Sequence, residues 1–80
     1  MRILIVEDEK NLCDMIGKSL HNAGYEVDLC YDGEDALEMI YAEKYDLIVL
    51  DLNLPGVDGM EILRELRKEN EETKVLILSA

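Results

Sequence analysis

The chain has 80 residues, which allows one domain with a marginal hydrophobic core. Nineteen acidic against eight basic residues give a formal net charge of −11, which excludes binding to nucleic acid or an anionic membrane surface unless a separate basic domain is attached. No apolar run approaches the roughly 20 residues of a membrane span, and the start of the chain lacks a signal-peptide pattern, so we expect a cytoplasmic protein. Cys13 and Cys30 lack metal-ligand spacing and are expected to be small buried apolar side chains.

The chain opens with a strand pattern followed by a helix pattern. Residues 3–6 form a continuous apolar run that ends in Glu7 and Asp8, which is typical of a strand buried on both faces of a parallel sheet. Residues 10–23 have the spacing of an amphipathic helix, which Gly24 ends. The apolar side of this predicted helix consists of Leu12, Met15, Ile16, Leu20 and Ala23.

The middle of the chain repeats this alternation. Residues 26–30 alternate between apolar and polar side chains, which predicts an edge strand with one solvent-exposed face. A turn at 32–33 leads into a second short helix, marked by Ala36, Leu37 and Ile40. Residues 46–50 then form another continuous apolar strand, which ends in Asp51.

The last third of the chain predicts a loop, a third helix and a fourth strand. After the loop over 52–57, Asp58 and Glu61 have the spacing of a capping box at a helix start. The apolar side of that helix consists of Met60, Ile62, Leu63 and Leu66. Residues 74–78 form the fourth strand, and the chain ends at Ser79 and Ala80.

The order of these elements predicts an α/β fold with a parallel sheet. Right-handed crossovers and the edge character of residues 26–30 favour the flavodoxin-like strand order 2-1-3-4 over a sequential sheet. The strand over 74–78 is apolar on both faces, whereas edge strands are usually blunted by charge, proline or a bulge. We therefore expect that the domain continues after Ala80 and that residues 1–80 are its N-terminal part.

Three acidic residues are expected to meet at the carboxyl end of this sheet. Glu7 and Asp8 follow the first strand and Asp51 follows the third, and the topological switch point lies between these strands. At ~5 Å and an effective dielectric constant of ~20, each charged pair repels by roughly 3 kcal/mol, so the cluster takes up protons or binds a cation. Oxygen ligands suit Mg²⁺ or Mn²⁺, and a carboxylate beside such a metal can be the nucleophile in phosphoryl transfer. The alternative is that these acids are solvated turn residues.

Three segments of the chain resemble the receiver family of bacterial response regulators, the CheY-like superfamily. They are residues 3–9 (ILIVEDE), residues 50–59 (LDLNLPGVDG) and residues 78–80 (LSA), in the order and spacing of that family. The resemblance covers the whole chain. It implies a flavodoxin-like receiver fold in which Asp51 accepts phosphate from a histidine of a partner sensor kinase.

The resemblance also implies a metal site around the acceptor. Asp8 and Asp51 would bind Mg²⁺ through their carboxylates, and Asn53 would bind it through its backbone carbonyl. Glu7 would support the metal through a water molecule. These residues match the family pattern position by position.

Further residues match parts of the family that shape the site. Ser79 corresponds to the hydroxyl that hydrogen-bonds the phosphoryl group, and Ala80 to the small residue that leaves the site open. Pro55 and Gly59 shape the loop after the acceptor. The family's fifth strand with its lysine, its aromatic switch residue and its two further helices have no counterpart in the chain, so we expect a receiver that lacks the last helix-strand-helix segment.

Two other functions compete with this interpretation. A phosphatase of the haloacid dehalogenase type also uses a strand-end aspartate and Mg²⁺. That family has an Asp-x-Asp motif after its first strand. Here Asp51 follows the third strand, and Asn53 stands where the motif has its second aspartate. An inactive folding or assembly fragment is the other alternative. We expect a signalling module and not an enzyme.

The expected partners follow from the same pattern. The first strand and residues 45–51 resemble receivers of OmpR-like transcription regulators, so DNA binding would belong to a separate C-terminal domain. The apolar strand over 74–78 predicts self-association between two copies of the chain, as an edge-to-edge or swapped dimer. The residues expected in that interface are Val75, Leu76, Ile77 and Leu78.

Overall fold

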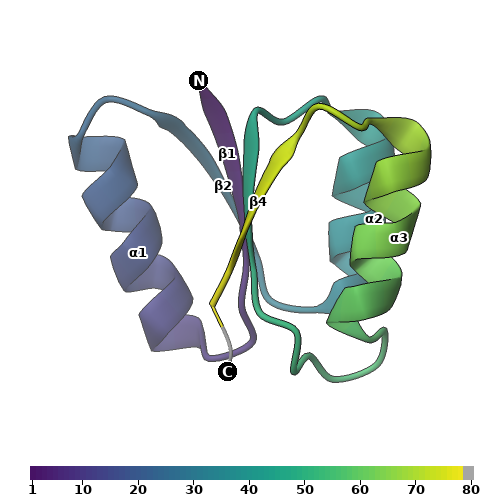
Figure 1. The fold of residues 1–80 in the computed structure, drawn as a ribbon. Helices are drawn as coiled ribbons and strands as arrows, with labels where there is room; N and C mark the ends of the chain where they lie inside the picture. Colours follow the sequence, from purple (N-terminus) through teal and green to yellow (C-terminus); the bar gives the residue numbers. More distant parts are fainter. Residues whose placement is uncertain (79–80) are drawn as a thin grey trace.

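A computed structural model describes residues 1–78, in which four parallel strands form one sheet in the order β2-β1-β3-β4 (Figure 1). The strands are β1 (Arg2–Val6), β2 (Glu26–Cys30), β3 (Leu47–Leu50) and β4 (Lys74–Ile77). The helices are α1 (Lys10–Asn22), α2 (Gly33–Ala42) and α3 (Gly59–Glu69). The predicted α/β class and strand order are confirmed.

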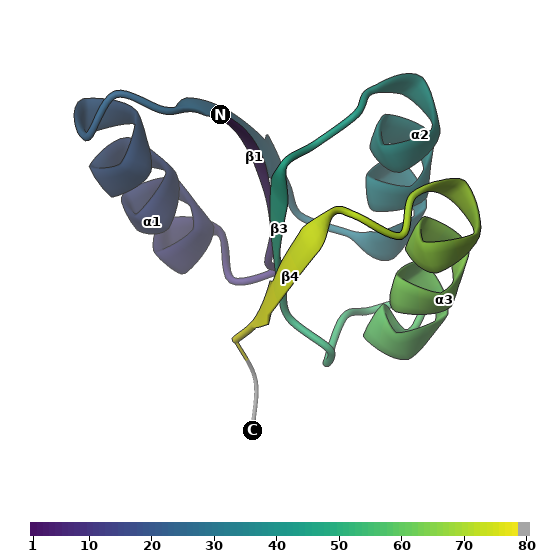
Figure 2. The ribbon, with the colours of Figure 1, turned by 45° about the horizontal axis from the view of Figure 1, so that its top comes forward.

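The sheet separates two apolar clusters of unequal size. Helix α1 covers one face, whereas α2 and α3 cover the other (Figures 1 and 2). Alternation along β1 sends Ile3 and Ile5 toward α1, and Leu4 and Val6 toward α2 and α3. Because β1 lies between two strands and is covered on both faces, its apolar side chains are fully buried, as the continuous run predicts. None of the helices in the described part of the chain is long and apolar enough to cross a membrane.

Helix α1 packs on its side of the sheet differently from the sequence prediction. Met15, expected on the apolar side, is 61% exposed, and Ala23 is also exposed because it lies at the helix end. The buried positions of α1 are instead Cys13 and Gly17. These residues are small and lie one turn apart, so the helix backbone comes close to the sheet. A Cβ atom on Gly17 would lie 2.5 Å from Leu29 Cδ2.

A polar network ties the strands together at the amino end of the sheet. The Asp28 carboxylate accepts hydrogen bonds from the Arg2 guanidinium at 3.0 Å and from the Tyr45 hydroxyl at 2.6 Å. These bonds hold the pKa of Asp28 below its usual range, with the Tyr45 hydroxyl as the larger cause. The network links β1, β2 and the segment before β3, in a sheet where Arg2 pairs with Glu26 and Ile3 with Leu47.

Strand β4 forms the edge of the sheet in the described part of the chain. It pairs with β3 in parallel, and Leu76 lies opposite Val49. In Figure 2 this strand stands at the near side of the sheet, clear of α1. Leu76, Ile77 and Leu78 are 55%, 39% and 40% exposed, so an apolar surface remains at this edge.

Candidate metal centre

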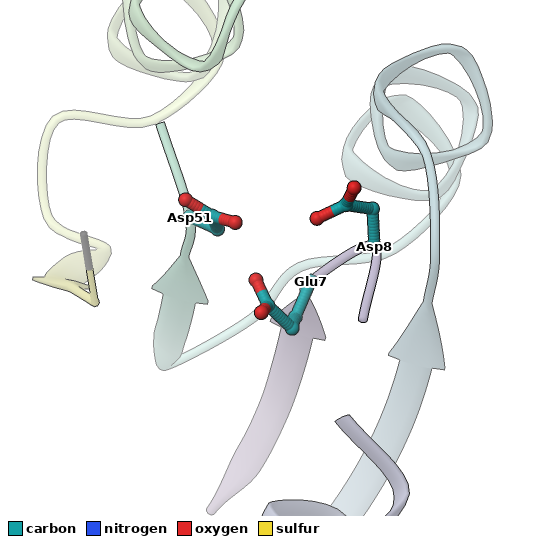
Figure 3. Close-up of side chains that lie close together, drawn as sticks. All are labelled: Glu7, Asp8 and Asp51. Atoms are coloured by element: carbon teal, nitrogen blue, oxygen red, sulfur yellow. The ribbon is translucent and has the colours of Figure 1, made fainter. Parts of the chain in front are cut away.

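Three carboxylates converge at the carboxyl ends of β1 and β3 (Figure 3). Glu7, Asp8 and Asp51 each offer one oxygen atom, and these three atoms all lie within 4.8 Å of one another. The sheet register explains the convergence, because Val6 pairs with Leu50 and the next residue of each strand enters the same space. The predicted meeting of the three acids is confirmed.

Glu7 is the buried member of the cluster. Its side chain projects from the end of β1 with the residue only 6% exposed, and its Oε2 atom has no hydrogen-bond partner among residues 1–78. The pKa of Glu7 is raised to about 7, chiefly by burial, and in smaller part by its hydrogen bond with Asp51 and by the negative charges of Asp51 and Asp8. A buried oxygen without a partner beside two further carboxylates is the environment that a cation stabilises, so the donor set fits a divalent metal.

Asp8 lies in the short connection between β1 and α1, and both of its neighbours are fixed. On one side, the Glu7 N–H donates to Cys30 O at 3.0 Å. On the other, the Glu9 carboxylate caps α1 by accepting from the Leu12 N–H at 2.7 Å. Glu9 therefore serves the helix and not the acid cluster, and the exposed Asp8 carboxylate is held at the mouth of the site.

Asp51 is the acceptor candidate and lies just after β3. It is 8% exposed, and its Oδ1 atom accepts a hydrogen bond from the Asn53 N–H at 3.0 Å. Asn53 lines the same hollow of ≈ 280 Å³ as Glu7 and Asp51. Its other wall is apolar and consists of Leu12, Ile16 and Leu78. The structure thus places Asn53 beside the acids, whereas the predicted roles of Ser79 and Ala80 fall on residues outside the described ones.

Comparison with known proteins decides the family. Residues 3–80 match the model of the response regulator receiver domain. The chain belongs to this family. The transcriptional regulatory protein DltR of Streptococcus agalactiae is 44% identical to it over 80 residues, which are 100% of this chain and 36% of DltR. The receiver therefore spans about a third of the length of the curated relatives that it matches.

Solved structures agree with the receiver fold. The response regulator TrrA of Thermotoga maritima, in complex with Mg²⁺-BeF, has a TM-score of 0.91 and 39% identity, over 99% of this chain and 69% of that one. A CheY-like receiver domain protein of Methanospirillum hungatei has a TM-score of 0.94 and 31% identity, over 98% of this chain and 62% of that one. TrrA in complex with the histidine kinase ThkA has a TM-score of 0.88 and 39% identity, over 99% of this chain and 68% of that one.

The loop after Asp51 of this receiver folds back on the end of β3. Gly59 is buried at the first position of α3, and a Cβ atom there would lie 2.9 Å from Asp51 O and 2.5 Å from Leu52 Cα. Asp58 caps α3 as predicted, but its carboxylate accepts from the Met60 N–H and not from the third helical residue of a capping box. Lack of a side chain at Gly59 therefore lets α3 begin directly against the backbone of Asp51 and Leu52.

The raised pKa of Glu7 predicts a pH dependence of stability in the metal-free receiver. Between its usual value of 4.5 and about 7, folded Glu7 keeps a proton that the unfolded chain releases. The free energy of unfolding should therefore decrease as pH rises through this window. The measurement is urea unfolding at pH 5 and pH 7.5, with Glu7→Gln as the control that stays neutral. If the difference in unfolding free energy between the wild type and Glu7→Gln were the same at both pH values, the raised pKa of Glu7 would be refuted.

Proposed function

We propose that this receiver is the phosphoacceptor module of a two-component response regulator. The Asp51 carboxylate attacks the phosphorus of a phosphohistidine on a sensor kinase. A P–O bond forms on Asp51 while the P–N bond breaks, and its electron pair returns to the imidazole. The observation that carries the proposal is the position of Asp51, buried at a strand end with two further carboxylates within 4.8 Å.

The residues around Asp51 are suited to hold Mg²⁺, or Mn²⁺ in its place. The Asp8 and Asp51 carboxylates and the Asn53 backbone carbonyl would bind the metal, with Glu7 supporting it through water. When bound, the metal neutralises negative charge between the carboxylates and the incoming phosphoryl group. TrrA, at 39% identity, was crystallised with Mg²⁺-BeF, which supports this assignment.

The receiver would act in the cytoplasm. Its proposed partners are a sensor histidine kinase and a separate DNA-binding domain. TrrA was crystallised with the histidine kinase ThkA, and DltR is a transcriptional regulatory protein. A net charge of −11 disfavours direct contact between the receiver and DNA, so DNA binding would belong to another part of a longer regulator. Ser79 would hydrogen-bond the phosphoryl group, a role that rests on the sequence pattern.

Stoichiometric labelling separates this signalling role from a phosphatase. With Mg²⁺ and acetyl phosphate, we expect at most one phosphoryl group per chain, and none with EDTA. With p-nitrophenyl phosphate, we expect no release of nitrophenol beyond the background of a buffer blank. Multiple turnovers that disappear in Asp51→Asn would favour the haloacid dehalogenase alternative, and an absence of both labelling and turnover would favour an inactive assembly fragment.

A second proposal concerns two copies of the chain. The exposed apolar residues of β4 and the strand edge that they occupy favour pairing with a second copy through this edge, in a dimer or a swapped dimer. The residues that would lie in the interface are Val75, Leu76, Ile77 and Leu78.

A further inference from the structure

The first residue of α2 lies in direct contact with the loop that follows the acceptor. This acceptor loop comprises residues 52–58. Gly33 is buried, and a Cβ atom built on it would lie 2.7 Å from Val57 O and 2.8 Å from Val57 Cβ. Both atoms belong to the rigid part of Val57, so no change of rotamer would relieve such a contact. The space beside Gly33 is therefore filled by the backbone of the acceptor loop.

The same loop is held at its other end by the start of α3. Gly59 lies against Leu52 and Asp51 O, and the Gly59 N–H donates to Leu52 O at 3.3 Å. Between these two supports lies Asn53, whose N–H donates to Asp51 Oδ1. Asn53 and Val57 therefore belong to one short loop that is held at both ends.

We propose that Gly33 is a positioning residue of the phosphoacceptor site. It acts through Val57, because lack of a side chain lets the acceptor loop lie against the start of α2 and so holds Asn53 and Asp51 in register with Asp8. The inference rests on the proposed function, since its consequence is the geometry of the Mg²⁺ and phosphoryl site. It adds the junction between β2 and α2, which contributes none of the three carboxylates, to the parts of the fold that determine that geometry.

A pair of glycine-to-alanine variants tests the proposal with matched chemistry. Gly33→Ala places a Cβ atom against the backbone of the acceptor loop, whereas Gly17→Ala places one against the flexible end of the Leu29 side chain, on α1. The measurements are Mg²⁺ affinity by titration calorimetry and the amide NMR shift of Asn53 without metal. We expect Gly33→Ala to weaken Mg²⁺ binding about tenfold or more and to move the Asn53 signal. We expect Gly17→Ala to change neither.

The outcomes separate this proposal from the function on which it rests. A wild-type protein that binds no Mg²⁺ would refute the proposed function. The Asn53 amide signal of Gly33→Ala, measured without metal, would still show whether Gly33 positions the loop. Folded Gly33→Ala with wild-type affinity and an unmoved Asn53 signal would overturn the positioning role. If Gly33→Ala does not fold, the same substitution is compared in a Val57→Gly background, which lacks one of the two contacting atoms. Val57 O would still lie 2.7 Å from the added Cβ atom in that background, so Gly33→Ala should still weaken Mg²⁺ binding and move the Asn53 signal, and an unchanged affinity and signal would overturn the positioning role.

Discussion

Replacing Asp8 by alanine is expected to abolish Mg²⁺ binding. Asp8 is the exposed carboxylate at the mouth of the cluster, and its oxygen lies within 4.8 Å of those of Glu7 and Asp51. Without it, the site keeps Glu7, whose pKa is raised chiefly by burial, and Asp51, whose Oδ1 atom already accepts the Asn53 N–H. Mg²⁺ needs nearly ideal octahedral geometry and gives up its waters reluctantly, so loss of a carboxylate from a small site has a large effect.

Calorimetric titration of the wild-type chain and of Asp8→Ala measures this effect. Glu38→Ala is the matched control, because it removes the same charge from an exposed position on α2. The control should bind Mg²⁺ as the wild type does, which separates loss of a ligand from loss of net charge. Equal affinity of Asp8→Ala and the wild type would rule out this metal site.

Charged substitutions in β4 are expected to convert a dimer of the 80-residue chain into a monomer. Leu76 and Ile77 are 55% and 39% exposed, although they belong to a strand with apolar residues on both faces. Edge strands of this kind pair readily with a second chain. Burial of their apolar side chains stabilises the dimer by about 25 cal/mol per Å² of apolar surface removed from water. Either Leu76→Lys or Ile77→Lys places a charge in the proposed interface, where it would lose its hydration.

Sedimentation equilibrium at micromolar concentrations distinguishes the two states. Tyr41→Lys is the control, because it makes the same kind of change at a 53% exposed position on α2. The net charge of −11 makes two copies repel each other, so added salt should strengthen the dimer by screening. A well-folded wild-type monomer with a sharp unfolding transition would contradict this prediction.

The sequence predicts the sheet and the acid cluster because both depend on short-range patterns. Continuous apolar runs over β1 and β3 specify strands that are covered on both faces, and alternation over β2 specifies an edge. Once β1 and β3 are neighbours in parallel, Glu7 and Asp51 must emerge side by side. The position of the acid cluster therefore follows from the strand order and from the residues that follow each strand.

Contacts that depend on side-chain size could not be predicted in this way. Periodicity placed Met15 on the buried side of α1, but the small residues Cys13 and Gly17 determine which side approaches β2. Glu9 was missed as the cap of α1 because Ser, Thr, Asp and Asn are the usual residues at that position. The contact between Gly33 and Val57 joins residues that are distant in sequence, so only the tertiary structure reveals it.

Mapping the modified residue shows whether Asp51 is the phosphoryl acceptor, as we propose. The chain is incubated with acetyl phosphate and Mg²⁺, the acyl phosphate is reduced with borohydride, and peptides are sequenced by mass spectrometry. We expect modification at Asp51, with none in Asp51→Asn and none in the presence of EDTA. Modification of another residue, or equal labelling of Asp51→Asn, would show that Asp51 is not the acceptor.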